Sequence, residues 1–363
     1  MKLALKLVSA MLATAVVSTG FVVWSQYDNF LNTPVNITPT NNLLEIKSGS
    51  NIRQVAAQLQ TAGVIQHDLL FFAHARLTGL ADKLKAGEYQ LETGMKPDDV
   101  LKKLVSGQAL QYQQKILEGK TFKDIMTDVR NNPLLQQTLN DADYAQIMQK
   151  LGAMTETKPE GWFFPDTYNF PRKTTDLDFL QRSYKDMQRY LQKAWDGRVP
   201  NPHIKTPYEA LILASIVEKE TGLPEERPLV ARVFLNRLAK NMMLQTDPTV
   251  IYGLGDKYDG NIRKVDLQTD TPYNTYTRFG LPPTPIATPS KAAIDAVMHP
   301  ASSDALYFVA TTPGGVSKFS TTLDEHNRAV QQYIVNRNKA NAAANEAAAP
   351  SIPPAVPTTG AKP

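Results

Sequence analysis

The pattern of apolar and polar positions predicts a small domain that uses the same local order twice. Residues 43–47 alternate as a short strand does, and apolar side chains then recur at helical spacing over residues 52–59. The order returns at residues 87–91 and 100–105, with a glycine-containing turn between strand and helix each time. We therefore expect a compact domain over residues 43–108, suited either to binding a carbohydrate or peptide or to a spacer without a ligand.

The longest apolar run lies near the start of the chain. Residues 7–24 contain no ionisable side chain, and a helix of that length covers about 27 Å, close to the hydrocarbon thickness of a bilayer. Two lysines precede the run and no Lys or Arg follows it before Lys47, so residues 1–6 are predicted to be cytoplasmic and the body exported. A cleaved signal peptide is the alternative, but the apolar run continues past the Ala-Thr-Ala at residues 13–15, which favours a transmembrane anchor.

Three further segments complete the outline. Residues 25–42 contain two prolines and several Asn and Thr, which predicts a linker. Residues 338–363 are mainly Ala, Asn, Pro and Thr, a composition that predicts a disordered tail. Residues 109–206 have a mixed pattern and include an aromatic cluster at residues 160–168, for which a packed floor between two lobes is favoured over a platform that stacks sugars.

The candidate chemistry lies in residues 207–337. Pro207 can start a helix, and the following residues are nearly all apolar until Glu218 and Glu220, so the helix is expected to be buried. Glu218 shares a face with Leu211, Ala214 and Ser215, where an apolar wall would suit a general acid. Glu220 lies about 200° around the helix from it. The structural alternative for either glutamate is an ion pair at the helix end, with Lys219, Arg227 or Arg232.

Polar residues farther along could bind a polyol. A turn rich in Gln, Thr, Asp and Tyr follows the second helix of this region, and two segments dense in Pro and Tyr come after it, a composition typical of cleft walls. Each of these residues also has an ordinary structural explanation, such as capping a helix. The substrate-binding candidates are Glu220, Asn236, Gln245, Asp247, Tyr252, Tyr273, Asn274 and Tyr276.

Composition narrows the classes of function. The chain has 363 residues, 42% of them hydrophobic, which is enough for two or three packed domains. It has no Cys, so disulfides, a thiolate nucleophile and Cys-ligated metals are excluded. The net charge of +4 is small and the basic and acidic residues are interspersed, which argues against a nucleic-acid partner. The histidines fit no metal or triad spacing and no glycine-rich phosphate motif occurs, so neither a metal nor an organic cofactor is expected.

Most of the chain resembles the MltG or YceG-like family of endolytic murein transglycosylases. The resemblance covers about residues 43–335, and the matching blocks occur in the family's order. They are ASIVEKET at 214–221, VFLNRL at 233–238, MLQTDPTV at 243–250, PYNTY at 272–276, GLPP at 280–283 and EHN at 325–327, with KAGEY at 85–89 and EGWFFPDTY at 160–168 upstream. Two departures are visible: residues 282–290 are PPTPIATPS where the family has PPGPIxNPG, and Val316-Ser317 replaces the usual His after two glycines.

The resemblance implies an α+β protein anchored in the inner membrane, with a LysM-like domain before a larger mixed α/β catalytic domain in the periplasm. It implies cleavage of the β-1,4 bond from MurNAc to GlcNAc within peptidoglycan strands, without water, to give 1,6-anhydro-MurNAc ends. In the family the catalytic acid is the first Glu of the EKET block, which is Glu218 here. The implied partners are glycan strands, the inner membrane and peptidoglycan synthases, and the implied role is to limit the length of nascent strands.

Two other functions stay open at this point. A muramidase would use Glu218 as acid and a second carboxylate, such as Glu220, Asp247 or Asp270, to activate water. A non-catalytic scaffold would use the anchor and the small domain to position a synthesis complex.

Overall fold

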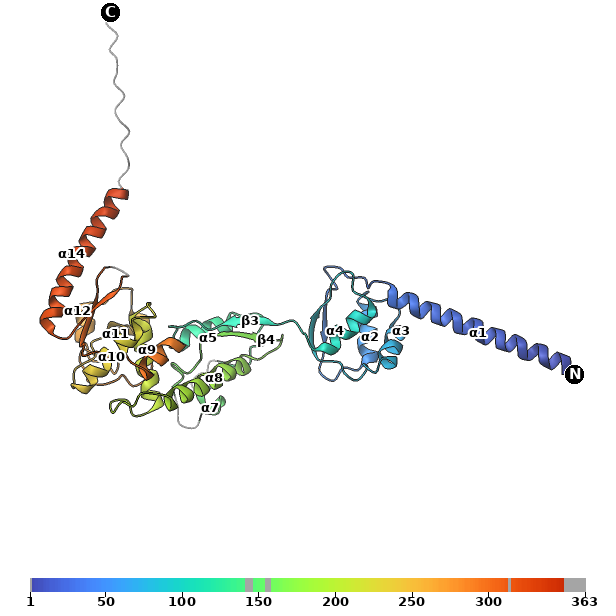
Figure 1. Ribbon diagram of the computed structural model, residues 1–363, viewed down its shortest axis with the longest axis horizontal. Helices are drawn as coiled ribbons and strands as arrows, with labels where there is room; N and C mark the ends of the chain where they lie inside the picture. Colours follow the sequence, from blue (N-terminus) through green and yellow to red (C-terminus); the bar gives the residue numbers. More distant parts are fainter. Residues whose placement is uncertain (1, 141–145, 154–157, 313–314, 349–363) are drawn as a thin grey trace, which may run out of the picture. The chain divides into compact units, whose positions relative to one another are not determined.

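A computed structural model describes residues 2–140, 146–153, 158–312 and 315–348 of the chain (Figure 1). Contacts divide the chain into two compact units. The first contains Met1–Gln114, Asn132–Thr138 and Tyr168–Asp176, and the second contains Lys115–Asn131, Leu139–Thr167 and Leu177–Pro363. Helices dominate both, and the strands that the structure describes form three two-stranded sheets. The predicted mixed α+β class is therefore confirmed.

The first unit has the strand, turn and helix order that the sequence predicts. Strands β1 and β2 pair antiparallel, with Leu44 opposite Tyr89, and both of these side chains are buried. Helix α2 begins at a capping box in which the side chains of Asn51 and Gln54 each accept a hydrogen bond from the other's backbone N–H. This fixes the residue at which the helix starts after the turn that follows β1. The elements up to the end of the small domain are α1 (Lys2–Asn32), β1 (Leu43–Ile46), α2 (Ile52–Thr61), α3 (Asp68–Leu77), β2 (Gly87–Gln90) and α4 (Pro97–Ser106).

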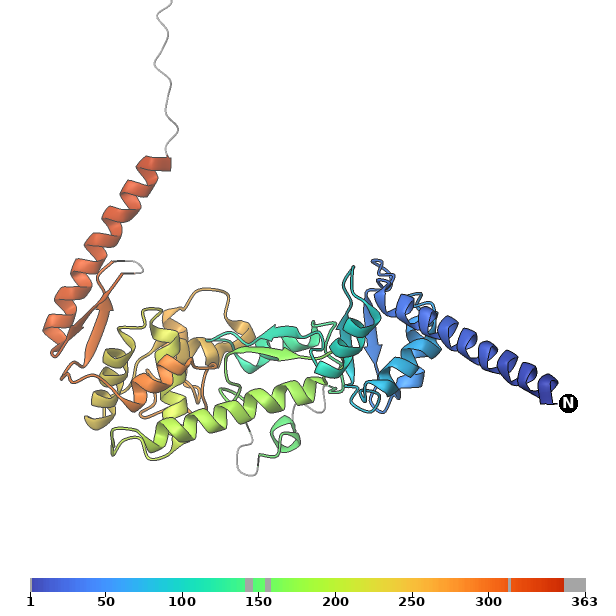
Figure 2. The same ribbon diagram turned by 45° about the vertical axis from the view of Figure 1, so that its right-hand side comes forward.

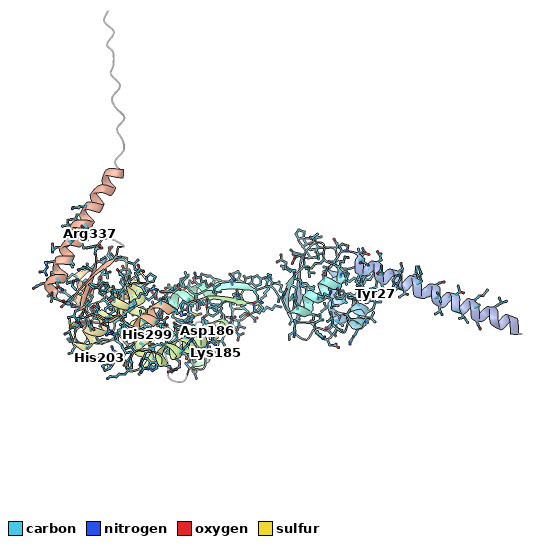
Figure 3. All side chains as sticks on the ribbon, viewed as in Figure 1. Tyr27, Lys185, Asp186, His203, His299 and Arg337 are labelled. Atoms are coloured by element: carbon cyan, nitrogen blue, oxygen red, sulfur yellow. The ribbon has the colours of Figure 1, made fainter. Side chains whose placement is uncertain are left out.

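The segment predicted as a linker, residues 25–42, is instead part of the first unit. Helix α1 continues to Asn32, and Phe30 and Val35 are buried in the core that α2, α3 and α4 share. Figure 3 labels Tyr27 near the end of α1, where its hydroxyl lies 2.8 Å from His74 Nδ1 of α3. The sequence pattern missed this because each of these apolar residues finds its neighbours far along the chain.

Among the described residues, α1 is the one helix long and apolar enough to cross a membrane, over Ser9–Asn32. Its apolar side chains are exposed within the chain, with Leu12 at 62% and Val16 at 68%. If α1 is a membrane anchor, the bilayer covers these side chains. If it is a signal sequence, the site that binds the signal sequence covers them. The span at residues 7–24 and the cytoplasmic residues 1–6 remain predictions.

The second unit is built around α9 (Pro207–Glu220), which packs against α10 (Arg227–Ala239) and α13 (Lys291–Met298). Every residue of α9 from Ala210 to Val217 is buried, as its apolar sequence predicts. The long helix α8 (Asp176–Asp196) precedes this core in the chain. The remaining helices between residues 112 and 268 are α5 (Phe122–Arg130), α7 (Ile147–Lys150), α11 (Asp247–Leu254), the short 3-10 helix η1 (Gly255–Lys257) and α12 (Lys264–Gln268). In the same part of the sequence, the strands β3 (Tyr112–Lys115) and β4 (Thr167–Phe170) pair to form one sheet.

A hairpin and a long helix end the described chain. Strand β5 (Tyr307–Ala310) pairs antiparallel with β6 (Ser317–Ser320), and the hairpin packs against the start of α14 (Leu323–Ala348), as Figure 2 shows. The predicted disordered tail therefore begins too early, because residues 338–348 continue α14. Alanine, which is frequent there, has the highest helix propensity. Residues 349–363 of the predicted tail lie outside the described residues.

Candidate active site

Glu218 lies in the last turn of α9, immediately after the buried run. Pro207 occupies the first turn, and the hydroxyl of the cap residue Thr206 accepts a hydrogen bond from the Glu209 N–H at 3.1 Å, which fixes where the helix begins. The Glu218 side chain is 8% exposed. The length of a capped, buried helix thus places one carboxyl group at the edge of the core.

The oxygens of Glu218 meet donors rather than apolar side chains. Oε2 accepts hydrogen bonds from the Ser290 N–H, at 3.0 Å, and from the Ser290 hydroxyl. Oε1 accepts from Arg227 Nη2 at 3.3 Å. The expected apolar setting is therefore wrong for the carboxyl oxygens and holds only for the helix behind them. Of the three cations considered from sequence Arg227 makes the pair, because Lys219 and Arg232 bind backbone carbonyls.

Ser290 ends an irregular segment, residues 285–290, that is fixed to several elements. The Ile286 N–H donates to the Ser215 hydroxyl of α9 at 3.0 Å, and the Thr288 N–H donates to the Lys120 carbonyl at 2.7 Å. The Ser290 hydroxyl also accepts from the Ala293 N–H and so caps α13. The donors on Glu218 Oε2 are thus held in place by backbone contacts on both sides.

The block at residues 160–168 packs under this segment. Gly161 has φ +80°, and a Cβ there would lie 2.5 Å from Pro285 Cβ, so only glycine fits. Trp162 is buried and stacks on Tyr208 with ring centroids 5.7 Å apart. The structure supports the interpretation of this block as a packed floor.

Glu160 is a buried carboxyl that the candidate residues from sequence did not include. It is 6% exposed, its Oε1 accepts from the Phe122 N–H at 2.9 Å, and its Oε2 accepts from the Tyr252 hydroxyl at 3.0 Å. Burial raises the pKa of Glu160 to about 7, against the two hydrogen bonds, which lower it. The sequence feature that could have identified Glu160 is its position as the acidic first residue of the aromatic block at residues 160–168.

A second carboxyl, that of the half-buried Glu220, belongs to a separate polar cluster. Its partner is the Thr246 hydroxyl, and burial raises the pKa of Glu220 to about 7, helped by Asp247 and opposed by the Thr246 hydrogen bond and Arg237. Glu218 and Glu220 share no partner, as their angular separation on the helix predicts. Nearby, the Tyr276 hydroxyl donates to Asp247 Oδ1 at 2.6 Å.

Gln245 stands beside this cluster in an unusual backbone conformation. Its φ is +50°, its side chain is exposed, and its N–H donates to the Thr275 carbonyl at 3.0 Å. Left-handed backbone is uncommon outside glycine and is often found at functional sites. Of the substrate-binding candidates, the structure therefore brings together Glu220, Gln245, Asp247 and Tyr276.

The other four candidates divide into two kinds. Tyr252 and Tyr273 meet edge to face with centroids 4.8 Å apart, and the Tyr273 and Thr284 hydroxyls lie 2.8 Å apart. Asn236 and Asn274, by contrast, use their amides on the backbone. Asn236 Nδ2 donates to the Ser303 and Ala305 carbonyls, and Asn274 Nδ2 donates to the carbonyls of Asp266, Leu267 and Thr269.

Among the described residues, none of the second carboxylates considered from sequence for a water-activating mechanism shares a hydrogen-bond partner with Glu218. Asp270 pairs with Arg278 at 2.8 Å, on the surface, and hydrogen bonds from Arg278 and Thr277 lower the pKa of Asp270 to about 2. Glu220 lies on another side of α9, with its own partner. Among the described residues, no group of three His, Asp or Glu is placed to hold a metal ion.

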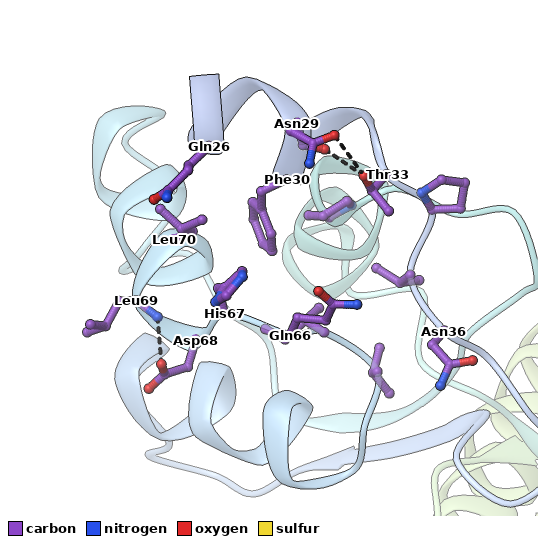
Figure 4. A pocket seen from close by; sticks show the side chains of 15 residues that line it. Gln26, Asn29, Phe30, Thr33, Asn36, Gln66, His67, Asp68, Leu69 and Leu70 are labelled. Atoms are coloured by element: carbon purple, nitrogen blue, oxygen red, sulfur yellow. Dashed lines mark hydrogen bonds between the residues drawn. The ribbon is translucent and has the colours of Figure 1, made fainter. Parts of the chain in front are cut away.

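Two hollows in the first unit are lined by both polar and apolar side chains. One, of about 510 Å³, lies between the start of α2 and the turn before β2, and its lining is Ser50, Asn51, Ile52, Arg53, Phe72, Arg76, Ala81, Asp82 and Leu84. The other, of about 400 Å³, is shown in Figure 4, where Phe30 from α1 points toward His67 and Leu70 at the start of α3, and Asn29 accepts a hydrogen bond from the Thr33 hydroxyl.

Comparisons with known proteins agree with the sequence resemblance. The model of the YceG-like family matches residues 44–332. An endolytic murein transglycosylase of Bacillus subtilis is 33% identical over 313 residues, which are 82% of this chain and 86% of the relative. One from Streptococcus pneumoniae is 30% identical over 80% of this chain and 58% of its own length. A crystal structure of a YceG-like protein from Listeria monocytogenes has a TM-score of 0.51 and 32% identity, and covers 79% of this chain and 98% of that one.

Replacing Gly161 with Ala is expected to destabilise the second unit. The new methyl group would overlap Pro285 and the backbone would be held at φ +80°, which together lower the free energy of unfolding by about 2 kcal/mol or more. Gly222→Ala is the matched control, because no heavy atom lies within 4 Å of its Cβ position. Urea unfolding followed by tryptophan fluorescence compares the two, and equal stability of both variants would contradict the packing argument.

Replacing Glu160 with Gln is expected to change how stability depends on pH. The folded protein binds the proton of Glu160 up to about pH 7, whereas the unfolded chain releases it near 4.5. Stability of the parent relative to Glu160→Gln should therefore fall by about 3 kcal/mol in all as pH rises through this window, and then level off. Glu220 is present in both proteins and cancels. Urea unfolding at several pH values measures the difference, and a difference independent of pH would show that Glu160 is not buried as a carboxyl.

Proposed function

The chain belongs to the YceG-like family, and from that membership we propose that it is an endolytic murein transglycosylase. It cuts the β-1,4 bond from MurNAc to GlcNAc within peptidoglycan strands. The observation that carries the proposal is the similarity to proteins named for this activity over about four-fifths of the chain. The position of Glu218 supports it, because hydrogen bonds hold this carboxyl in one place at the end of a buried helix, and a general acid or base must be held in a defined position.

The proposed reaction needs a single carboxyl group. Glu218 donates its proton to the glycosidic oxygen as the bond from MurNAc C1 to that oxygen breaks, and positive charge develops at C1. The resulting carboxylate then takes the proton of the C6 hydroxyl of the same MurNAc, whose oxygen forms the new bond to C1. The products are a strand ending in 1,6-anhydro-MurNAc and a strand beginning with a free GlcNAc hydroxyl. Protons balance and no water is consumed.

Polar and aromatic side chains near α9 are proposed to bind the sugars. Gln245, Asp247 and Tyr276 form one group, supported by the exposure of Gln245 and by the hydrogen bond between the other two. Tyr252 and Tyr273 form a second group with one ring edge on the other. Asn236 and Asn274 are assigned a supporting role instead, because their amide donors are already bound to the backbone.

The first unit is proposed to hold the enzyme at its substrate. Helix α1 would anchor the chain in the inner membrane, with the chain that follows α1 in the periplasm. The hollow that includes Arg53, Phe72 and Asp82 combines an aromatic ring with charged and polar groups, a combination that binds sugars, and we propose it as an accessory glycan site of a LysM-like domain.

Glu218→Gln is expected to remove activity while leaving the fold intact. Loss of the proton donor should lower the rate of strand cleavage by about 100- to 10,000-fold. Mass spectrometry of digested glycan strands provides the measurement, since an anhydro end is one water lighter than a hydrolysed end. Glu225→Gln, a matched change at an exposed residue, should retain parental activity.

The same experiment separates the alternatives. Products one water heavier would identify a muramidase, and absence of any product from the parent protein would favour the scaffold. Parental activity in a folded Glu218→Gln protein would contradict the assignment of the catalytic acid.

A further inference from the structure

Helix α3 has one buried face and a second face that stays partly open. Phe71 and Ala75 on the first face are enclosed in the core of the first unit. Leu70, Ala73 and Leu77 follow one another at spacings of three and four residues, so they share the second face. Leu77 at its end is 76% exposed. A single exposed leucine is ordinary in a folded protein, so the meaning of this one depends on the surface around it.

The open face of α3 continues an apolar surface of α1. Leu70, Ala73 and Leu77 line one hollow of about 750 Å³ together with residues of α1 that lie between Leu12 and Tyr27. Every residue of this lining is uncharged. In Figure 1, α3 lies on the side of the small domain from which α1 leaves it. The two helices therefore form one contiguous apolar surface.

The junction of the two helices is fixed by a hydrogen-bonded histidine and by a buried ring. The Tyr27 hydroxyl of α1 lies 2.8 Å from His74 Nδ1 of α3, and His74 Nε2 lies 2.9 Å from Asp98 Oδ1 of α4. Phe30, near the end of α1, is buried in the core that these helices share. Helix α1 is thus held firmly on the first unit. A bilayer that encloses α1 up to Trp24 must also meet the face of α3 that lines the same hollow.

The end of α1 indicates the depth at which α3 meets the bilayer. Trp24 ends the apolar run and Tyr27 follows it, and aromatic residues at the end of a transmembrane helix lie in the membrane–water interface. Both line the same hollow as Leu77. Arg76 Nη1 lies 3.4 Å from Asp82 Oδ2, and both of these side chains are exposed. The end of α3 thus presents an apolar side chain for the acyl layer and charged groups for the headgroups, as interfacial helices do.

We propose that the end of α3, through Leu77, docks on the periplasmic leaflet of the membrane that α1 spans. The partner is the lipid bilayer itself, and the inference rests on the proposed anchor. The first unit then has two contacts with the bilayer, a helix through it and a helix on it, and cannot turn freely about the end of α1. The hollow proposed as an accessory glycan site, which also includes Arg76 and Asp82, consequently lies close to the membrane surface. A strand bound there lies next to the bilayer rather than deeper in the cell wall.

The test places a fluorescent label at single introduced cysteines, which is possible because the chain has no Cys of its own. Full-length protein is reconstituted as single copies in nanodiscs of phosphatidylethanolamine and phosphatidylglycerol, with or without bromine on the acyl chains near the headgroups. Bromine quenches a label only on contact. A label at Leu77→Cys should lose emission on bromination about as strongly as a label at Val22→Cys, in the outer part of the proposed span. A label at Leu43→Cys, at an exposed leucine of β1 outside the hollow, should not.

A second step tests whether Leu77 makes the contact. The label is placed at Ala73→Cys, and Leu77 is replaced in the same chain by Asp or by Phe. Leu77→Asp should weaken the quenching at position 73, because a carboxylate does not enter the acyl layer, whereas Leu77→Phe should retain it. Since Leu77 is exposed in the folded unit, neither change removes a core contact.

The outcomes separate this inference from the proposed function. Quenching at position 22 without quenching at position 77 would support the anchor and overturn the docking of α3. No quenching at position 22 would contradict the anchor and the docking with it, whereas strand cleavage is measured separately. Equal quenching at positions 43 and 77 would overturn the docking as well. So would a label at position 77 whose blue-shifted emission bromine does not quench, because protein rather than lipid then covers it. Equal quenching at position 73 in the Asp and Phe variants would overturn the role of Leu77.

Discussion

The burial of α9 is the constraint on which the candidate site depends. Eight consecutive residues of this helix are enclosed, so its position against α10 and α13 leaves little freedom. The first charged residue after that run is Glu218, and the donors that meet it come from the first turn of α10 and from the cap of α13. The same hydrophobic packing that stabilises the second unit thus also brings together an acid, a cation nine positions farther along the chain and a serine 72 positions away.

Local features of the fold could be predicted from the sequence, because their causes are local. The strand and helix periods of residues 43–59 and the proline-started helix at Pro207 depend on neighbours within a few positions, and the structure has both elements. The position of Glu218 at the end of the buried run followed from the same reasoning. The inclusion of Phe30 in the first core did not, since its partners lie on α2, α3 and α4.

The surroundings of the glutamates could not be predicted for the same physical reason. The contact of Ser290 with Glu218 spans 72 positions and that of Tyr252 with Glu160 spans 92. No periodicity encodes such pairs. Two residues that depart from the family pattern also make long-range contacts. The Thr284 hydroxyl lies 2.8 Å from that of Tyr273, and Ser317 donates hydrogen bonds to the carboxylate of Glu226. Both substituted side chains take part in contacts that fix the neighbourhood of the site.

The left-handed conformation of Gln245 completes this account. Such a backbone costs about 1 kcal/mol or more for a residue with a Cβ, so other contacts must hold it. The Thr275 carbonyl accepts the Gln245 N–H, and the Thr275 hydroxyl accepts the Thr246 N–H and lies 2.9 Å from the Thr249 hydroxyl, so the strained residue sits on a buried threonine network. The backbone of this exposed residue is thus fixed by buried contacts before any ligand arrives. In the proposed function, a glycan that contacts Gln245 would not have to order this loop, which would leave more of its binding free energy for the reacting sugar.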